Sequence, residues 1–249
     1  MVAVHIKGLD PEWPHLLPNE RLIYSLLGLS SPHPRIAQCL NTNLYSLPAE
    51  TRVQVAETEP LRLAVAPNGD VEQYLFRHPG VSQHQRATWG KQIAEGIAYL
   101  HSHNIVWGDC CPANMLLTAD LDVLLCDFGG SSMPGARKNS VAPPIQYCDP
   151  ALDFSYNFSG DRKIDIFAFG CVFLEILTCN ADTVAAGWQP VLYRGGRAFN
   201  SQKLLIDTVV FDPFKLIVEN CWDGSYADGT QLFVAVNDAW VQFQQAEKC

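Results

Sequence analysis

The stretch that most constrains the fold is Ile105–Gly130, which reads IVWGDCCPANMLLTADLDVLLCDFGG. Two short apolar runs lie within it, Met115–Leu117 and Val123–Cys126, and the turn-like segment Thr118–Asp122 separates them. Apolar runs of this length on either side of a turn predict a β-hairpin. Whatever the chain folds into must therefore place a hairpin in the middle of the sequence.

Three polar residues frame this hairpin. Asp109 and Asn114 precede it, five residues apart, and Asp127 opens an Asp-Phe-Gly triplet directly after it. Taken singly, each is a weak signal, because Asp and Asn in loops are usually turn formers or helix caps. Their joint spacing around a hairpin is far more specific, and we interpret the three as a functional set.

The composition limits the classes of partner. The net charge of −9 argues against a nucleic-acid binder, because phosphate backbones attract clustered Lys and Arg. A single nucleotide site stays possible, since it needs only a few local donors and a metal. The longest apolar stretch, Ile166–Leu177, is too short to span a bilayer, so we expect no membrane partner.

The nine cysteines include no CxxC pair, and the first residues lack a basic segment leading into an apolar run. We therefore expect reduced thiols and a cytoplasmic or nuclear location. Cys110 and Cys111 are adjacent, but no set of four ligands with metal spacing accompanies them. We interpret the pair as small buried residues with one thiol near the site.

The rest of the chain divides into a mixed first part and a helical second part. The first part has apolar or helical patterns that predict strands at Val2–Ile6, Thr51–Glu57 and Leu61–Val65, a helix at Asn19–Leu27 and a turn at Ala66–Gly69. The second part predicts a helix from Gln83 to about His103 and a long loop at Ser131–Tyr156. An apolar helix that ends near Leu177 follows, with Ser159 or Asp161 as its N-cap. Further helices are expected at Lys203–Val210, at Pro213–Cys221 and, with Asp228 as its N-cap, at Gly229–Ala246.

The Asp109, Asn114 and Asp-Phe-Gly motifs resemble those of the protein kinases, whose catalytic loop reads H-R-D-x-x-x-x-N and whose metal-binding turn reads D-F-G. The resemblance extends over nearly the whole chain and looks closest to a divergent fungal branch. The other matching segments are Glu20, which is similar to the glutamate of the αC helix, and Leu61–Leu75, Gly96–Asp109, Tyr147–Ala151, Lys163–Gly170 and Asn220–Trp222.

The resemblance implies an α+β, bilobal fold in a single domain over residues 1–249. Residues 1–65 would form a reduced N-terminal β lobe, residues 66–69 the hinge, and residues 70–249 a mainly helical C-terminal lobe. No G-x-G-x-x-G motif precedes the first strand. We therefore expect that the molecule either lacks a phosphate lid or is truncated at its start.

The resemblance also assigns roles. Asp109 would accept the proton of the substrate hydroxyl, while Asn114 and Asp127 would hold Mg²⁺, a hard cation that prefers oxygen ligands. Leu63 at the gatekeeper position and Val65, directly before the hinge, would contact ATP. A further residue, Asp165, would hydrogen-bond the backbone of the catalytic loop rather than take part in the chemistry.

The lysine that binds phosphates in this family is ambiguous here. The family's V-A-I-K strand aligns with Val2–His5, which places His5 at the lysine position. Lys7 lies two residues on, on the same face of a strand, and is the alternative, with imperfect reach. Glu20, at the position of the αC glutamate, would belong to the same nucleotide-binding set.

Two other cations of the family pattern are replaced. Gly108 stands where an arginine precedes the catalytic Asp, so we expect no phosphorylation switch acting through it. Cys111 stands at the position of the catalytic-loop lysine, and Ala113 supplies no arginine. The loss of a positioned charge donor commonly lowers the rate by roughly 10²–10³. A further replacement, Ala151, removes the glutamate that closes the activation segment.

Three functions follow, in order of preference. The first is an ATP:protein phosphotransferase, Ser/Thr type by default and of weak activity, with ATP and a protein substrate as partners. The second is an impaired pseudokinase that acts as a binding or scaffold module for a protein partner. The third is a small-molecule phosphotransferase, which the long stretch between Asp127 and Pro150 disfavours because it leaves room for a peptide platform.

Overall fold

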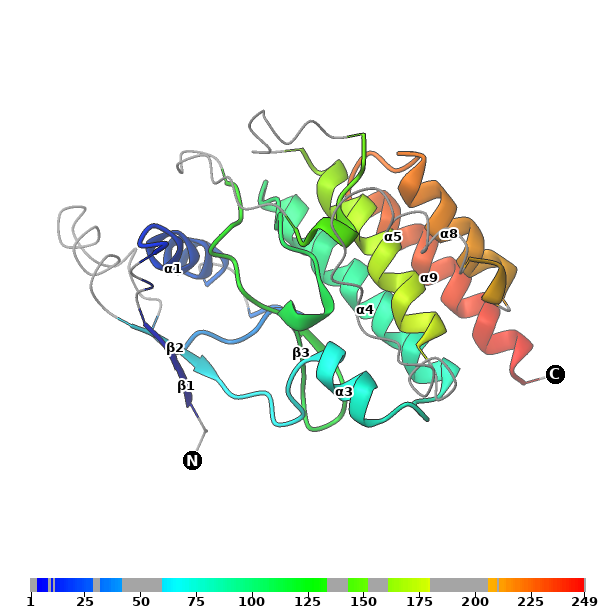
Figure 1. The fold of residues 1–249 in the computed structure, drawn as a ribbon, viewed down its shortest axis with the longest axis horizontal. Coiled ribbons are helices and arrows are strands. Elements are labelled where there is room, and N and C mark those ends of the chain that lie inside the picture. Colours follow the sequence, from blue (N-terminus) through cyan, green and yellow to red (C-terminus); the bar gives the residue numbers. More distant parts are fainter. Residues whose placement is uncertain are drawn as a thin grey trace.

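The computed structural model describes residues 4–8, 10, 12–28, 32–41, 60–133, 143–151, 161–179, 206–209 and 211–248, and for residues 4–6 only the backbone. In Figure 1, two strands and one helix stand at one side of the molecule, and four long helices lie together at the other. A second two-stranded sheet lies between these groups. The mixture of helices with small sheets agrees with the expected α+β class.

The first sheet pairs β1 (Val4–Lys7) with β2 (Leu61–Ala64) in antiparallel register. Beside it lies α1 (Leu16–Leu27), which begins three residues earlier than the pattern predicted. Pro18 falls in its first turn, where a missing N–H leaves no hydrogen bond unmade. The expected strand Thr51–Glu57 and the residues Val2 and Ala3 lie outside the described residues.

The connector after β2 is tied to the central hairpin. Gly69 has a φ of 73°, a left-handed conformation that costs glycine little. The Asn68 N–H donates to the Leu117 carbonyl at 3.2 Å, and the Leu117 N–H donates to the Gly69 carbonyl at 2.8 Å. The predicted turn at Ala66–Gly69 is therefore present, and it leads into the short helix α3 (Val71–Arg77).

The predicted hairpin is confirmed, as β3 (Met115–Leu117) pairs with β4 (Val123–Leu125) in antiparallel register. A single turn of 3-10 helix, η2 (Pro112–Asn114), precedes it. Both apolar ends of each strand are buried, so the hairpin is fixed against the core. The residues on either side of it are held in place by this packing.

The long helix α4 (Gln83–Ser102) begins at Ser82, whose hydroxyl caps the Gln85 N–H. The apolar residues that predicted it are all fully buried: Trp89, Ile93, Ile97 and Leu100. Against it packs α9 (Gly229–Ala246), capped as expected by Asp228. The two helices come close at Gly229, where an added Cβ would lie 2.8 Å from the Ala98 backbone.

The central pillar is α5 (Lys163–Thr178), which is buried from Ile164 onward. Asp161 accepts a hydrogen bond from the Lys163 N–H at 2.9 Å, while Ser159 lies outside the described residues. Two other predictions are met in part. The helix Pro213–Cys221 is α8 (Asp212–Trp222), and of Lys203–Val210 the described part is the 3-10 turn η4 (Ile206–Thr208). Another 3-10 turn, η3 (Ile145–Tyr147), lies within the predicted long loop.

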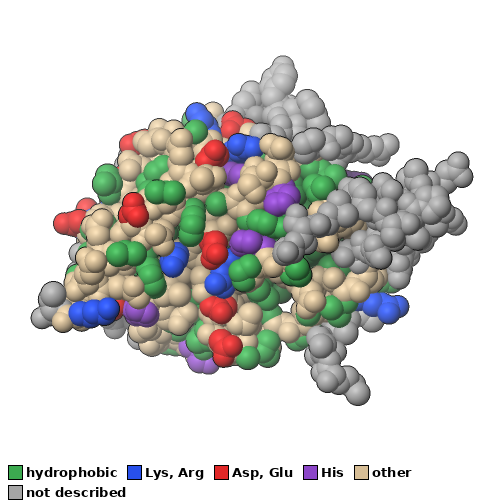
Figure 2. Space-filling view, turned by 180° about the vertical axis from the view of Figure 1, so that it is seen from behind, with side chains coloured by type: hydrophobic (Ala, Val, Ile, Leu, Met, Phe, Trp, Pro, Cys, Tyr) green, Lys and Arg blue, Asp and Glu red, His purple; other side chains and the backbone are tan. Residues whose placement is uncertain are grey.

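The surface carries both signs of charge. On the face shown in Figure 2, acidic and basic side chains are interspersed among apolar and neutral ones. Within the described ranges, no helix combines the length and apolarity needed to cross a bilayer.

Candidate active site

An ion-pair cluster around the buried Glu20 joins β1, α1 and the Asp-Phe-Gly turn. The Lys7 Nζ lies 2.7 Å from the Glu20 Oε2 and 2.9 Å from the Asp127 Oδ1. Burial raises the pKa of Glu20, and the Lys7 charge partly offsets that rise. Burial lowers the pKa of Lys7, but the two carboxylates raise it more, so it stays above its usual value. Lys7 is therefore a fixed cation held between two elements.

The sequence favoured His5 over Lys7 for this position, and the geometry places the alternative, Lys7, in the cluster. Lys7 makes both contacts at ion-pair distance, while its reach toward a phosphate stays a prediction. The reason lies in the register, because Lys7 pairs with Leu61 at the end of β1 that faces α1. The side chain of His5 lies outside the described residues.

Asp109 and Asn114, the two residues predicted for a catalytic loop, contact each other directly. The Asn114 Nδ2 donates to the Asp109 Oδ2 at 2.8 Å and to the Asp109 carbonyl at 3.1 Å. Burial raises the pKa of Asp109 to about 6, although the hydrogen bond from Asn114 lowers it and the nearby Asp127 raises it further. The side-chain nitrogen of Asn114 donates to Asp109, so the side-chain oxygen, Oδ1, is the Asn114 atom available to a cation.

Asp127 lies at the edge of the site with its side chain about 41% exposed. Its φ of 55° is left-handed, a conformation that costs a non-glycine residue roughly 1–2 kcal/mol. Backbone strain of this kind is found at functional sites, where the surrounding structure maintains it. Here the Trp107 indole holds the turn by donating to the Cys126 and Asp127 carbonyls at 3.1 and 3.2 Å.

Asp165 fixes the backbone of the catalytic loop, as predicted. It is fully buried and accepts from the Trp107 and Gly108 N–H groups, both at 2.7 Å. His101 Nε2 donates to the same carboxylate at 2.9 Å, because its Nδ1 already accepts from the Gly229 N–H at 2.8 Å. Gly108 has a φ of 76°, so a glycine here avoids the Cβ strain that an arginine would carry.

Sequence reasoning missed Asn19, the neighbour of Glu20 on α1. Its buried side-chain Nδ2 lies within hydrogen-bond distance of three carbonyls of the Asp-Phe-Gly segment: Ser131 at 2.8 Å, Gly129 at 2.9 Å and Phe128 at 3.3 Å. These partners are more than a hundred residues away in the chain, so no local pattern could have indicated them. Asn19 thus ties α1 to the segment that carries Asp127.

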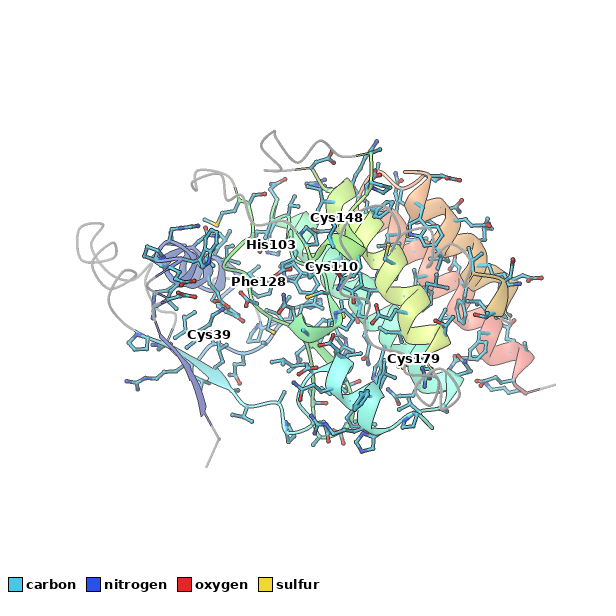
Figure 3. The ribbon with its side chains drawn as sticks, in the orientation of Figure 1. Cys39, His103, Cys110, Phe128, Cys148 and Cys179 are labelled. Atoms are coloured by element: carbon cyan, nitrogen blue, oxygen red, sulfur yellow. The ribbon has the colours of Figure 1, made fainter. Side chains whose placement is uncertain are left out.

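Aromatic rings fill the space behind the cluster. The Phe128 ring lies edge-on to Tyr24 of α1, with centroids 5.1 Å apart, and its centroid is 6.4 Å from that of Trp107. Figure 3 shows Phe128 between α1 and the helices of the larger side. The Asp-Phe-Gly turn is therefore packed from both directions.

A cavity of about 380 Å³ opens beside the cluster. Most of the predicted contact residues line it, namely Lys7, Glu20, Leu63, Val65, Asn114 and Asp127. Asp109 reaches this group through Asn114. The site residues fit Mg²⁺, because a carboxylate and an amide oxygen face one space and Mg²⁺ usually keeps several waters in addition.

The cysteines behave as the sequence indicated. Cys110 is fully buried, and burial raises its thiol pKa well above the usual value. Cys111 lies with its Sγ 4.0 Å from the Asp109 Oδ1, and burial again raises its pKa, so it is a neutral thiol near the carboxylate. Figure 3 shows the labelled cysteines spread over the molecule. The described residues include no group of three or more His, Cys, Asp or Glu arranged for a metal.

Comparison with known proteins agrees with this geometry. The family model described as protein kinase domain matches residues 25–185. The chain belongs to the protein kinase domain family. This kinase domain is 30% identical over 129 residues to serine/threonine-protein kinase PKH2 of Saccharomyces cerevisiae, a match that covers 46% of this chain and 12% of that protein.

Two other relatives support the same family. Mitogen-activated protein kinase kinase kinase 12 of Rattus norvegicus is 32% identical over 142 residues, covering 54% of this chain and 15% of the relative. Probable serine/threonine-protein kinase MARK-A of Dictyostelium discoideum is 28% identical over 182 residues, covering 71% and 16%. The kinase domain described here spans less than a fifth of the length of these three relatives.

Proposed function

We propose that this kinase domain is a Mg-ATP-dependent protein phosphotransferase of the Ser/Thr type. The observation that carries the proposal is the Lys7 ammonium, held between Glu20 and Asp127 on the wall of a cavity that Asn114 also lines. A fixed cation beside two oxygen ligands for Mg²⁺ suits the β- and γ-phosphates of a nucleotide. The domain would extend over residues 1–249, with a reduced β lobe at 1–65, a hinge at 66–69 and a helical lobe at 70–249.

Each residue has a proposed task. Leu63 and Val65 would contact the adenine, and Lys7 would bind phosphate oxygens while Glu20 holds its side chain in place. Asn114 and Asp127 would bind Mg²⁺, which neutralises charge on the phosphates when bound.

Asp109 would accept the proton of the substrate hydroxyl. A pKa of about 6 suits a base that works near neutral pH, because the carboxylate is ionised there and still binds a proton readily. The hydrogen bond from Asn114 fixes one carboxylate oxygen, so the other can face the hydroxyl.

The second candidate is a pseudokinase that binds nucleotide or a protein partner without turnover. The observation that favours it is the neutral Cys111 thiol beside Asp109, where a cation would offset charge on the transferred phosphoryl group. Gly108 and Ala113 add no charge to the loop either. A small-molecule phosphotransferase remains the third choice.

A thermal-unfolding titration with ATP, with and without Mg²⁺, tests the nucleotide site. A ligand at about 100 times its Kd stabilises a fold by roughly 2.7 kcal/mol, which the scan detects. We expect a Mg²⁺-dependent shift that Asp127→Asn abolishes and that the matched variant Asp120→Asn, in the exposed hairpin turn, retains. No shift at millimolar nucleotide would overturn the enzyme proposal. A shift without phosphate transfer to any tested protein would favour the pseudokinase.

A further inference from the structure

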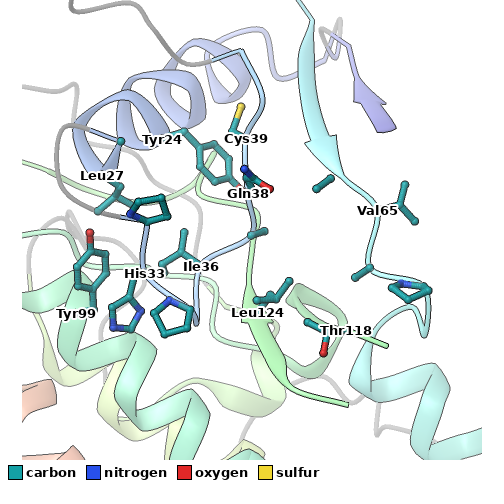
Figure 4. A pocket seen from close by; sticks show the side chains of 17 residues that line it. Tyr24, Leu27, His33, Ile36, Gln38, Cys39, Val65, Tyr99, Thr118 and Leu124 are labelled. Carbon is teal, nitrogen blue, oxygen red and sulfur yellow. The ribbon is translucent and has the colours of Figure 1, made fainter. Parts of the chain in front are cut away.

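The connector between β2 and α3 has open space on both sides. A cavity of about 530 Å³ lies behind it, and Ala64, Val65 and Ala66 line this cavity as well as the one beside Lys7. Figure 4 shows Thr118, at the turn of the hairpin, beside the connector that follows Val65. A segment that borders cavities gains little from side-chain packing, so the hydrogen bonds at its end decide where it lies.

Three hydrogen bonds of Asn68 and Gly69 fix the end of the connector to the central hairpin. The Asn68 side-chain Nδ2 donates to the Thr118 carbonyl at 2.6 Å. The Asn68 N–H donates to the Leu117 carbonyl at 3.2 Å, and the Leu117 N–H donates to the Gly69 carbonyl at 2.8 Å. The shortest of the three is the one that depends on the side-chain amide of Asn68.

Asn68 also stands directly before a glycine, in the one Asn-Gly pair of the sequence. In such a pair the glycine nitrogen attacks the asparagine Cγ and closes a succinimide ring. The N–Cγ bond forms, the Cγ–Nδ2 bond breaks, and the glycine N–H proton leaves with the ammonia. Water then adds across either carbonyl of the ring and yields aspartate or isoaspartate. Glycine favours the closure because it has no Cβ and a permissive backbone.

The surroundings of this pair leave room for the reaction. Asn68 and Gly69 are both half-buried, so water reaches them. No atom beyond the two chain neighbours lies within 4 Å of the place where a Cβ of Gly69 would be. The Gly69 N–H donates to the Ala66 carbonyl in a long turn bond of 3.2 Å. What opposes ring closure is the bond that holds the Asn68 amide against the Thr118 carbonyl.

Conversion would remove the donor that faces Thr118. In aspartate a carboxylate oxygen takes the place of Nδ2, so it meets the Thr118 carbonyl oxygen and the two repel each other. In isoaspartate the main chain also gains one carbon between the Cα of residue 68 and the nitrogen of Gly69. That extra carbon alters the spacing of the two bonds to Leu117. Both products therefore oppose the docking of the connector on the hairpin.

We propose that Asn68 is a site of spontaneous deamidation, with water as the co-reactant, and that its conversion releases the connector from the hairpin. The ring closes when the connector has left the hairpin, because the docked amide faces the Thr118 carbonyl. Release is one-way, since water does not restore the amide. The site does not depend on phosphoryl transfer, although the connector it releases is a wall of the cavity beside Lys7.

Timed incubation in mildly alkaline buffer tests the reaction, with peptide mass spectrometry on the folded protein and on protein unfolded in urea. We expect the Asn68 peptide to gain the mass difference between an amide and an acid and to separate into two chromatographic forms. One hydrogen bond should slow the folded protein about three- to tenfold relative to the unfolded one. Asn104 precedes the β-branched Ile105 and should keep its mass.

Two results of the incubation would overturn the proposal. The first is a folded protein that keeps its Asn68 amide throughout an incubation about tenfold longer than the unfolded protein needs. The second is equal rates in the folded and the unfolded protein, because docking would then have no part in the reaction.

Variants at position 68 test the release. Asn68→Asp supplies the carboxylate of the product, and Asn68→Ala removes the side-chain bond without adding charge. We expect NMR to show faster amide exchange at Leu117 in both, by about tenfold in Asn68→Asp and by less in Asn68→Ala. Asn104→Asp makes the same charge change at the end of α4 and should leave Leu117 unaffected. Unchanged exchange at Leu117 in Asn68→Asp, or equal effects of the two charge variants, would contradict the proposal.

Discussion

The carboxylates on two walls of the candidate active site have different electrostatic surroundings. On the wall formed by β1 and α1, the Lys7 cation lies within 3 Å of both Glu20 and Asp127. On the catalytic-loop wall, Asp109 has an amide from Asn114 and a neutral thiol from Cys111, with no cation in the loop. On the first wall a cation partly offsets the rise that burial causes in the pKa of Glu20, whereas on the second an amide partly offsets the rise in the pKa of Asp109 to about 6.

The difference teaches that the two tasks proposed for the site, binding phosphates and accepting a proton, would have separate electrostatic bases. A buried ion pair is costly to break, because removal of one partner leaves the other charge unpaired. Burial raises the pKa of Asp109 to about 6 and the Asn114 amide only partly opposes that rise, so this carboxyl group binds a proton closer to neutral pH than an ordinary Asp does. Removing the charge of Lys7 should therefore change stability and rate at the first wall. At the loop wall, the rate should depend on an added charge and on pH.

The largest effect is expected from Lys7→Met. The variant leaves the fully buried Glu20 without its cation, so the free energy of unfolding should fall by about 2–3 kcal/mol. Phosphoryl transfer should fall by roughly 10²–10³. Chemical denaturation and a protein-phosphorylation assay check both. The control is His5→Gln, which should change either quantity little; equal losses in the two variants would contradict the role given to Lys7.

A smaller change, in the opposite direction, is expected from Cys111→Lys. The new cation would lie near Asp109 and offset the charge of the transferred phosphoryl group, so the rate should rise about tenfold or more. Cys111→Met adds length without charge and serves as the matched control. The comparison between the two walls would lose its basis if both variants changed the rate alike.

The third prediction concerns pH. Asp109 must be ionised to accept a proton, and its pKa is raised to about 6, so the rate should fall about tenfold per pH unit below about pH 6. Stability should respond in the opposite sense. A raised pKa favours the protonated folded state, so this group's contribution is present at low pH and is lost as the pH rises through about 6.

Asp109→Asn separates the two effects. It removes the activity, and it should also remove that part of the pH dependence of unfolding. In Cys111→Lys, the added positive charge should shift the acid limb of the rate profile to lower pH. A limb that stays in place would show that another group controls it.

The smallest effect is expected from Asn19→Ala. The loss of its bonds to the Asp-Phe-Gly segment loosens Asp127 relative to Lys7, and we expect a rate lower by about three- to tenfold. Amide exchange over residues 127–131 should become faster. Gln83→Ala removes an amide contact to the Leu177 carbonyl, away from the site, and should leave both measurements unchanged.

Much of the fold was predictable because its signals are local. The hairpin, the cap at Asp228 and the burial of Trp89, Ile93 and their helical neighbours follow from periodicity and turn chemistry. The choice between His5 and Lys7 was not predictable in this way, because residues two apart on a strand share a face. Only the placement of α1 decides which of them meets Glu20.

The rest depends on contacts between distant segments. The bonds of Asn19 to the Asp-Phe-Gly segment join residues more than a hundred positions apart. The cavity behind the connector likewise exists only where α1, α4 and β2 come together. Neither the bonds of Asn19 nor this cavity can be predicted from the pattern of residues along the chain.

The hydrogen bonds of His101 connect the C-terminal helix, α9, to the loop that carries Asp109. One imidazole joins the first residue of α9 to the carboxylate that holds the Trp107 and Gly108 backbone. Displacing α9 from α4 would remove the bond that fixes the tautomer of His101, whose Nε2 is one of the three donors to the Asp165 carboxylate behind the loop of Asp109.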